Sequence, residues 1–376
     1  MSVVIDLGEL GAGDWGVAGG KAASLGQLLR AGIPVPPGFV VTIAAFQQAL
    51  AELDPDGSMR GQVERLAAED TEAIARVTAQ VRARITAAPL PADVFGEIAA
   101  RYRALGGGLQ APSASGPGSG DLPVAVRSSA TGEDTAEASF AGLQDTYLWV
   151  RGAQGVADHL RRCWASLFNA EAVGYRRRLS VGEQDLAMAV VVQQMVEPRC
   201  AGVMFTRSPA TGDRSVIAVE GCWGLGSALV SGEVTPDSFV ISKVTGEIVR
   251  RTVAAKPRQH RSGPGGTGVT AADVPEPLRD QPCLRDEQIA ALARLGRRVE
   301  DLYGTPQDIE WAITDDGGPG QGIVLLQSRP ETVWARRAAP PVATPRPRAV
   351  DHVFEQLGRA HPVAPRRPPA EGPRER

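Results

Sequence analysis

The sequence predicts an α/β (α+β) protein in which helical patterns come first and strands dominate after residue 122. Two observations carry this prediction. Residues 60–105 repeat apolar side chains at helical spacing, whereas later segments are short apolar runs separated by turn residues. The 376 residues are 43% apolar and 22% charged, which is typical of a globular chain with a core large enough for several subdomains.

The first 50 residues predict a compact opening unit. The segment Gly19–Lys21 leads into a helix over residues 22–30, which presents three leucines on one face. Gly32 can end this helix, and the three prolines within 34–37 enforce an extended segment before a short strand at 39–41. The helices of residues 60–105 follow, interrupted by two prolines.

From residue 122 onward the sequence predicts two helices and a series of strands. The helices cover residues 155–178 and 285–303, where apolar residues recur every three or four positions. The sequence does not show whether residues 254–282 are ordered. The predicted strands are 122–127, 145–150, 186–196, 201–206, 215–220, 237–242, 247–253, 308–313 and 322–328.

A stretch rich in glycine, serine and proline divides the chain. We predict an N-terminal subdomain at residues 1–108, a linker at 109–121 and a second subdomain at 122–335. Residues 336–376 are rich in proline and arginine and predict a disordered basic tail.

Composition and charge exclude several classes of partner. The net charge of −3 gives no reason to expect a nucleic acid. The four cysteines are far apart, so a structural zinc site or a disulfide framework is not expected. The longest apolar run, residues 186–192, is too short to cross a bilayer, and no signal peptide is recognisable. We therefore predict a cytoplasmic protein without a membrane partner.

The strongest functional signal lies at the end of one predicted strand. The apolar residues Val124–Val126 run directly into Arg127 and the Ser/Thr/Gly-rich loop 128–146. An arginine pairs phosphate oxygens bidentately, and a turn of free backbone N–H groups binds anions, so this position suits phosphates. An ordinary strand end with a surface arginine is the alternative.

The two closing strands carry a second signal. Asp308 and Glu310 fall on one face of their strand, and Gln327 and Arg329 share a face of the next. If these strands pair, two carboxylates, an amide and a guanidinium meet on one surface. Mg²⁺ takes such oxygen ligands together with phosphate, and an arginine nearby can neutralise a transferring phosphoryl group. A salt-bridged sheet face exposed to solvent is the alternative.

Two weaker signals complete the pattern. Lys21 precedes a helix after two glycines, where it can lie over phosphates, although this is no P-loop and the glycines also suit a simple turn. Gln194 and Met195 end a buried strand. This segment is either a plain strand exit or a connection whose backbone groups read an adenine edge while Met195 packs on the base.

In order along the chain, these segments resemble the nucleotide-binding domain of the phosphoenolpyruvate synthase, pyruvate phosphate dikinase and rifampicin phosphotransferase superfamily. The resemblance implies an ATP-grasp-like fold with several subdomains around a central cleft. It covers about residues 10–335. The matching segments are 19–26, 33–39, 125–134, 138–146, 202–212, 223–226, 306–311 and 327–332.

The resemblance implies a site for ATP and Mg²⁺. Glu310 and Gln327 would hold the metal, while Arg329, Arg127 and Lys21 would act in catalysis on the phosphates. The loop after Arg127 would close over the nucleotide. The binding residues that it implies are Lys21, Arg127, Ser128, Ser129, Thr146, Gln194, Met195, Asp308, Glu310 and Gln327.

In this superfamily a histidine in a Gly-Gly-x-Thr/Ser-x-His-x-Ala context carries the phosphoryl group, and no histidine here has that context. The resemblance therefore implies a separate subunit with the phosphohistidine, as in phenylphosphate synthase. AMP and phosphate are the expected products, and a small molecule such as pyruvate or phenol is the expected final acceptor. Two alternatives stay open: a self-sufficient ATP-dependent kinase or ligase, and a non-catalytic ATP-sensing module.

Overall fold

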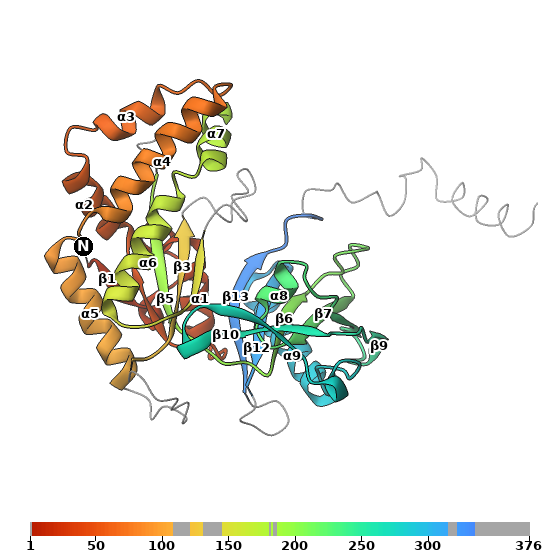
Figure 1. Cartoon of the computed structure of the whole chain (residues 1–376). Coiled ribbons are helices and arrows are strands. Elements are labelled where there is room, and N and C mark those ends of the chain that lie inside the picture. The colour runs from red at the N-terminus through yellow and green to blue at the C-terminus, as the bar shows by residue number, and fades with distance from the viewer. Residues whose placement is uncertain are drawn as a thin grey trace, which may run out of the picture. The chain divides into compact units, whose positions relative to one another are not determined.

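Two large antiparallel β-sheets, a separate two-stranded sheet and the helices packed against them form the part of the chain that the structure describes (Figure 1). This computed structural model describes residues 2–107, 121–130, 145–179, 182, 186–314 and 322–334. The mixture of helices and sheets confirms the predicted α/β (α+β) class. The first sheet has the spatial order β1 (Val4–Asp6), β2 (Gly38–Val41), β5 (Met188–Gln194), β3 (Val124–Ala130) and β4 (Thr146–Val150). The second has the order β13 (Ile323–Pro330), β12 (Gln307–Ile313), β6 (Cys200–Phe205), β7 (Val216–Trp223), β8 (Asp237–Ser242) and β9 (Ile248–Thr252).

The first sheet is covered on both faces, and its central strand β5 is buried from Met188 to Gln193, with apolar side chains from Met188 to Val192. Helix α1 (Trp15–Arg30) packs on one face, where Leu25 joins a buried cluster with Val191. Helix α6 (Ala153–Ser166) packs on the other face, where Leu160 joins a second cluster with Val190. Since successive residues of a strand point to opposite faces, β5 anchors both layers.

The second sheet has one apolar face and one face with polar residues. Ile309 and Ile313 of β12 share a buried cluster with Leu292 and Val299 of helix α9 (Asp286–Tyr303). The alternation along β12 therefore turns Glu310 to the opposite face, as its burial pattern also indicates. The predicted helix at 285–303 and the predicted closing strand agree with these elements to within one residue.

The remaining helices extend the first sheet's outer layer. Helical periodicity predicted that helices occur here but not where each one begins and ends. The predicted helix 155–178 is two helices, α6 and α7 (Ala170–Leu179), and the predicted helix 22–30 begins earlier as α1, with Gly19 as a non-helical residue inside it. Residues 60–105 form the predicted helices. They are α3 (Ser58–Glu64), α4 (Thr71–Ala87) and α5 (Ala92–Gly107), and α2 (Ile43–Leu53) is a further helix that was not predicted from the sequence.

Three strands had no counterpart among the predicted ones. β1 is three residues long, and β10 (Arg258–Ser262) and β11 (Val269–Asp273) form a hairpin within residues 254–282. The first sheet contains β1 and β2 from before the predicted linker 109–121 and β3, β4 and β5 from after it. The predicted domain boundaries stay a prediction. The predicted tail lies outside the described residues. Within the described ranges, no helix is long and apolar enough to cross a membrane.

Candidate functional site

Arg127 joins the two sheets. It lies in β3, all seven residues of which are buried, and its side chain is only 10% exposed. Its Nη1 donates to the carbonyl oxygen of Leu326 at 2.7 Å, and its Nη2 donates to Glu310 Oε2 at 2.9 Å and to Gln327 Oε1 at 2.8 Å. The structure thus brings three of the predicted site residues into direct contact.

The closing strands pair in the predicted way. Glu310 lies opposite Gln327, and Asp308 lies opposite Arg329, in the antiparallel pair β12–β13. The register shifts directly after Glu310, so Leu326 is an extra residue on β13. Such a bulge disrupts the ladder locally, and here the freed Leu326 carbonyl is the one that accepts the arginine's hydrogen bond.

Asp308 is an unusual carboxylate at this site. Burial raises its pKa to about 6, and the nearby Glu331 acts in the same direction, whereas Arg329 opposes the shift. Arg329 Nε lies 3.6 Å from Asp308 Oδ2, and Oδ1 is buried without a hydrogen-bond partner among the described residues. Because buried polar atoms are normally satisfied, this oxygen is available to a ligand, ion or water. The Arg329 side chain is 46% exposed.

Lys21 is held against the same strand as Arg127. Its Nζ donates to the carbonyl oxygen of Ser128 at 2.7 Å, and the residue is 5% exposed. Close contact of α1 with β3 depends on Gly19, whose φ is +73° and where a Cβ would come within 2.0 Å of the Ser129 carbonyl oxygen. The Ser129 hydroxyl accepts from the backbone N–H of Ala22 at 3.1 Å. Ser128 and Ser129 are therefore buried parts of this α1–β3 contact.

The end of β5 provides the other predicted part of the site. The backbone N–H groups of Gln194 and Met195 donate to the carbonyls of Pro37 and Pro123, both at 2.9 Å. These two N–H groups already have acceptors within the protein. Backbone contacts to an adenine would therefore have to come from the carbonyl groups of this segment or from the backbone of a neighbouring residue such as Val196. The side-chain Oε1 of Gln194 is buried without a partner in the described part of the chain.

A cavity of about 290 Å³ connects these two regions. Thr146, which pairs with Arg127 across β3 and β4, is one of its walls. Its lining residues include Ala125, Arg127, Thr146, Leu148, Gln194, Met195, Val196, Glu310 and Leu326. The predicted residues that do not line it are Lys21, Ser128, Ser129, Asp308, Gln327 and Arg329. Residues 131–144 of the predicted loop lie outside the described residues.

The oxygen atoms at this cavity fit a magnesium ion that also binds phosphates. Glu310 Oε2 and Gln327 Oε1 converge on one nitrogen of Arg127, so both point to a common position. Mg²⁺ usually takes one or two protein oxygens and completes its shell with water and phosphate. The described residues contain no group of three or more His, Cys, Asp and Glu that could hold a metal. A positively charged guanidinium occupies that position here.

The sequence prediction missed one carboxylate on the same sheet face. Glu220 of β7 lies in line with Glu310, because both pair with Val203 of the intervening strand β6. Burial raises the pKa of Glu220. The period-2 pattern of β7 was visible in the sequence, but only the strand order places Glu220 and Glu310 on one face, two strands apart.

Comparisons with known proteins give a family match over most of the chain. Residues 16–349 match the family described as "Pyruvate phosphate dikinase, AMP/ATP-binding domain". The chain is 46% identical over 324 residues to a probable phosphoenolpyruvate synthase of Methanothermobacter thermautotrophicus, covering 86% of this chain and 45% of that protein. It is 44% identical over 331 residues to a rifampicin phosphotransferase of a Streptomyces species, covering 88% of this chain and 36% of that protein. With a phosphoenolpyruvate synthase of Aeropyrum pernix it shares 38% identity over 375 residues, which is 93% of this chain and 44% of that protein. The chain spans less than half the length of each of these relatives.

Proposed function

This chain belongs to the pyruvate phosphate dikinase AMP/ATP-binding domain family, and we propose that it activates Mg-ATP to phosphorylate a histidine on a separate partner chain. The observation that carries the proposal is the convergence of Glu310 and Gln327 on Arg127 at one end of the cavity. The other end is formed by Gln194 and Met195, so a single elongated ligand can contact both groups.

The proposed roles follow the positions of the side chains. Gln194 and Met195 hold the adenine, with the unpartnered Gln194 Oε1 as an acceptor for a base N–H group. Arg127 of β3 and Lys21 of α1 bind the phosphates. Their charged groups lie beside the same buried strand, because Lys21 Nζ donates to the carbonyl of Ser128, the residue that follows Arg127. Ser128 and Ser129 support them from within the α1–β3 contact, and Thr146 lies at the cavity wall opposite Arg127.

Glu310 and Gln327 are the proposed ligands of Mg²⁺, with Asp308 beside them. When bound, the metal neutralises charge on the phosphates and orients them for transfer. With the metal bound, the Arg127 guanidinium would no longer hold these two oxygens and could bind phosphate instead. Arg329 extends from the next position on the same strand face, where it can stabilise the charge of the transferring group.

The phosphohistidine is proposed to lie on a partner rather than among this chain's four histidines. Of the two in the described residues, His159 bonds within its own helix and His260 bonds to Ser227 and Glu233. Neither is among the residues that line the cavity of Arg127. A nucleophile must be in line with the phosphoryl group that it receives, so neither fits the acceptor role. AMP and phosphate are the proposed products, and pyruvate or phenol represents the class of final acceptor.

The test combines the purified chain with Mg-ATP and a candidate partner that carries the Gly-Gly-x-Thr/Ser-x-His-x-Ala motif. We expect AMP formation that depends on both proteins, and an acid-labile phosphate on the partner's histidine. Arg329→Ala should retain nucleotide binding and lose AMP formation. The matched control is Arg250→Ala, an exposed arginine on the distant edge strand β9, which should leave both unchanged.

Three results would contradict the proposal in different ways. Acceptor-dependent ATP consumption by this chain alone indicates a self-sufficient kinase or ligase. Tight ATP binding without turnover, whatever the partner, indicates a sensing module. An Arg329→Ala variant with full AMP formation excludes the role proposed for that side chain.

A further inference from the structure

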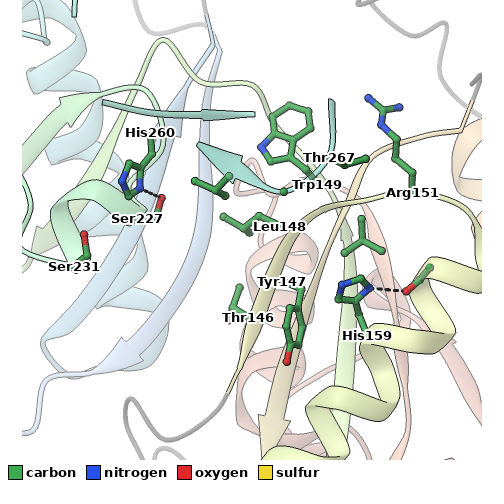
Figure 2. A pocket seen from close by; sticks show the side chains of 14 residues that line it. Thr146, Tyr147, Leu148, Trp149, Arg151, His159, Ser227, Ser231, His260 and Thr267 are labelled. Atoms are coloured by element: carbon green, nitrogen blue, oxygen red, sulfur yellow. Dashed lines mark hydrogen bonds between the residues drawn. The ribbon is translucent and has the colours of Figure 1, made fainter. Parts of the chain in front are cut away.

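A second cavity of about 630 Å³ extends along β4, next to the proposed nucleotide cavity (Figure 2). We call it the β4 cavity. It shares Thr146, Leu148 and Ser227 with the nucleotide cavity. Its other walls come from α6, from the β10–β11 hairpin and from the short helix α8 (Ser227–Val230). The residues that line it are Thr146, Tyr147, Leu148, Trp149, Val150, Arg151, Gly155, His159, Ser227, Ser231, His260, Thr267, Gly268 and Val269.

One wall of this cavity carries a chain of three hydrogen-bonded side chains. Ser227 Oγ lies 2.9 Å from His260 Nδ1, and His260 Nε2 lies 3.1 Å from Glu233 Oε2. A carboxylate only accepts hydrogen bonds, so in a neutral imidazole Nε2 carries the proton and Nδ1 is free to accept from the Ser227 hydroxyl. This is the arrangement in which a histidine acts as the base for a serine nucleophile, here through Nδ1.

The surroundings keep this arrangement in place. The His260 side chain is only 13% exposed, whereas Glu233 is 52% exposed and reaches the imidazole from the solvent side. Hydrogen bonding from His260, together with that from Ser231, holds the pKa of Glu233 below its ordinary value. The carboxylate therefore stays charged and keeps the proton of His260 on Nε2.

The wall formed by β4 carries strain and an unused donor. Trp149 has a φ of +60°, and within the described ranges it is the only non-glycine residue with a positive φ. Such a conformation costs about 1–3 kcal/mol and is found mainly at functional sites. The residue is 5% exposed, and its indole Nε1 is buried without a hydrogen-bond partner among the described residues. The indole lines the β4 cavity, as Figure 2 shows.

We propose that Ser227 is a nucleophile for small aryl esters that bind in the β4 cavity, with His260 as its base and Glu233 as a positioning residue. The Ser227 Oγ forms a bond to the ester carbonyl carbon, and its proton passes to His260 Nδ1. The bond to the aryl oxygen breaks, and that oxygen leaves with the proton from His260. Water then attacks the acylated Ser227 with the same assistance, which releases the carboxylic acid and restores the serine.

The aromatic part of the ligand follows from the opposite wall. The rings of Tyr147 and His159 lie with their centroids 4.8 Å apart, and both line the cavity together with Leu148, Val150 and Val269. Figure 2 shows this pair across the cavity from Ser227 and His260. A flat apolar ring packs well against such side chains, while the ester group reaches the serine.

Two probes test the proposal: a fluorophosphonate, from which an activated serine displaces fluoride, and p-nitrophenyl acetate as an aryl ester. We expect the fluorophosphonate to label Ser227, as mapped by peptide mass spectrometry, and Ser227→Ala to remove the label and the esterase activity. His260→Ala should lower both rates about a hundredfold, the usual contribution of a general base. The control is Ser215→Ala, which removes the hydroxyl of an exposed serine that lines neither cavity, and this change should leave labelling unchanged.

Glu233 is tested by rescue. Glu233→Gln should slow labelling, and Glu233→Asp should restore part of the rate, because only the carboxylate fixes the tautomer. Circular dichroism and the thermal melting midpoint of each variant show whether it is folded. Labelling of Ser231 or of several residues at equal rates, or a wild-type esterase rate equal to that of a folded Ser227→Ala variant, would overturn the proposal. The test does not depend on phosphotransfer, so it stands or falls separately from the proposed function.

Discussion

Replacing Arg127 by methionine separates the two tasks that the structure gives this side chain. The change removes three hydrogen bonds between β3 and the β12–β13 pair, at 2.7 to 2.9 Å. Charge-assisted bonds to a buried group are each worth about 1.5–3 kcal/mol, but Glu310 is 39% exposed and regains water when the arginine is lost. We therefore expect the free energy of unfolding to fall by about 2–3 kcal/mol and the melting midpoint by roughly 4–8 °C.

The effects of Arg127→Met on ligands should have opposite signs. In the absence of nucleotide, Glu310 and Gln327 lose the cation that occupies their oxygens, so binding of Mn²⁺ should strengthen by about tenfold. ATP binding should weaken by about 10- to 100-fold, because the phosphates lose a charge-assisted partner. Mn²⁺ binding is measured by electron paramagnetic resonance without nucleotide, and ATP binding by calorimetry.

The control is Arg176→Met, which removes a buried arginine of α7 whose Nη1 donates to the Leu167 carbonyl at 2.7 Å. This variant should lose stability and keep the wild-type affinities for Mn²⁺ and ATP. The reasoning is refuted if Arg127→Met weakens Mn²⁺ binding or leaves it unchanged while the protein remains folded. That outcome would mean that Glu310 and Gln327 do not hold the metal.

Three further changes test the structure by denaturant unfolding. Gly19→Ala should destabilise the protein by at least about 2 kcal/mol, because its φ of +73° disfavours a side chain and the added Cβ meets the Ser129 carbonyl oxygen at 2.0 Å; an unchanged midpoint would contradict the close α1–β3 contact. Lys256→Met should cost about 3–5 kcal/mol, because Lys256 Nζ and Asp237 Oδ1 form a fully buried ion pair at 2.6 Å and the carboxylate is left without its counter-ion; a loss below 1 kcal/mol, on the order of a surface pair, would argue against this pair. Burial raises the pKa of Glu220 in the folded protein above its ordinary value of 4.5, so the stability linked to its protonation is fully present below 4.5 and is lost as the pH rises through the raised pKa. Glu220→Gln should therefore be more stable than the wild type at pH 8, with a difference that shrinks toward pH 4, and a constant difference would show that Glu220 does not titrate with folding.

The sequence allowed the prediction of those parts of the site that depend on local pattern. Alternation along β12 and β13 placed Asp308 and Glu310 on one face, and Gln327 and Arg329 on the facing strand, as the pairing shows. This works because a strand has a strict period of two, so one correctly assigned strand fixes the face of every residue in it. The contact of Arg127 with this face agrees with the site that the resemblance implied.

Features that depend on distant contacts were not visible in the pattern. The extra residue Leu326 shifts the β12–β13 register, and no sequence signal marks a bulge that contains an ordinary leucine. Ser227 and His260 are 33 positions apart, and the histidine lies in a hairpin that no periodicity predicted. The three-residue strand β1 is too short for a period to be read, and it is held by its neighbour β2 rather than by its own propensity.

The position of Arg127 also links the proposed metal site to the proposed phosphate site. Glu310 and Gln327 direct their oxygens to one point, and Arg127 Nη2 supplies a positive hydrogen-bond donor there. This donor satisfies both oxygens, so a metal has to displace it, and its loss in Arg127→Met should therefore strengthen Mn²⁺ binding. Metal binding would exchange one cation for another at these oxygens. The same exchange frees the guanidinium beside the phosphates, so metal binding and phosphate binding should strengthen each other in the wild type.

Because Arg127→Met removes the exchanged group, the affinity of Mn²⁺ should depend much less on ATP in that variant than in the wild type. Equal dependence in the two proteins would show that Arg127 holds the sheets together without linking the metal to the phosphates.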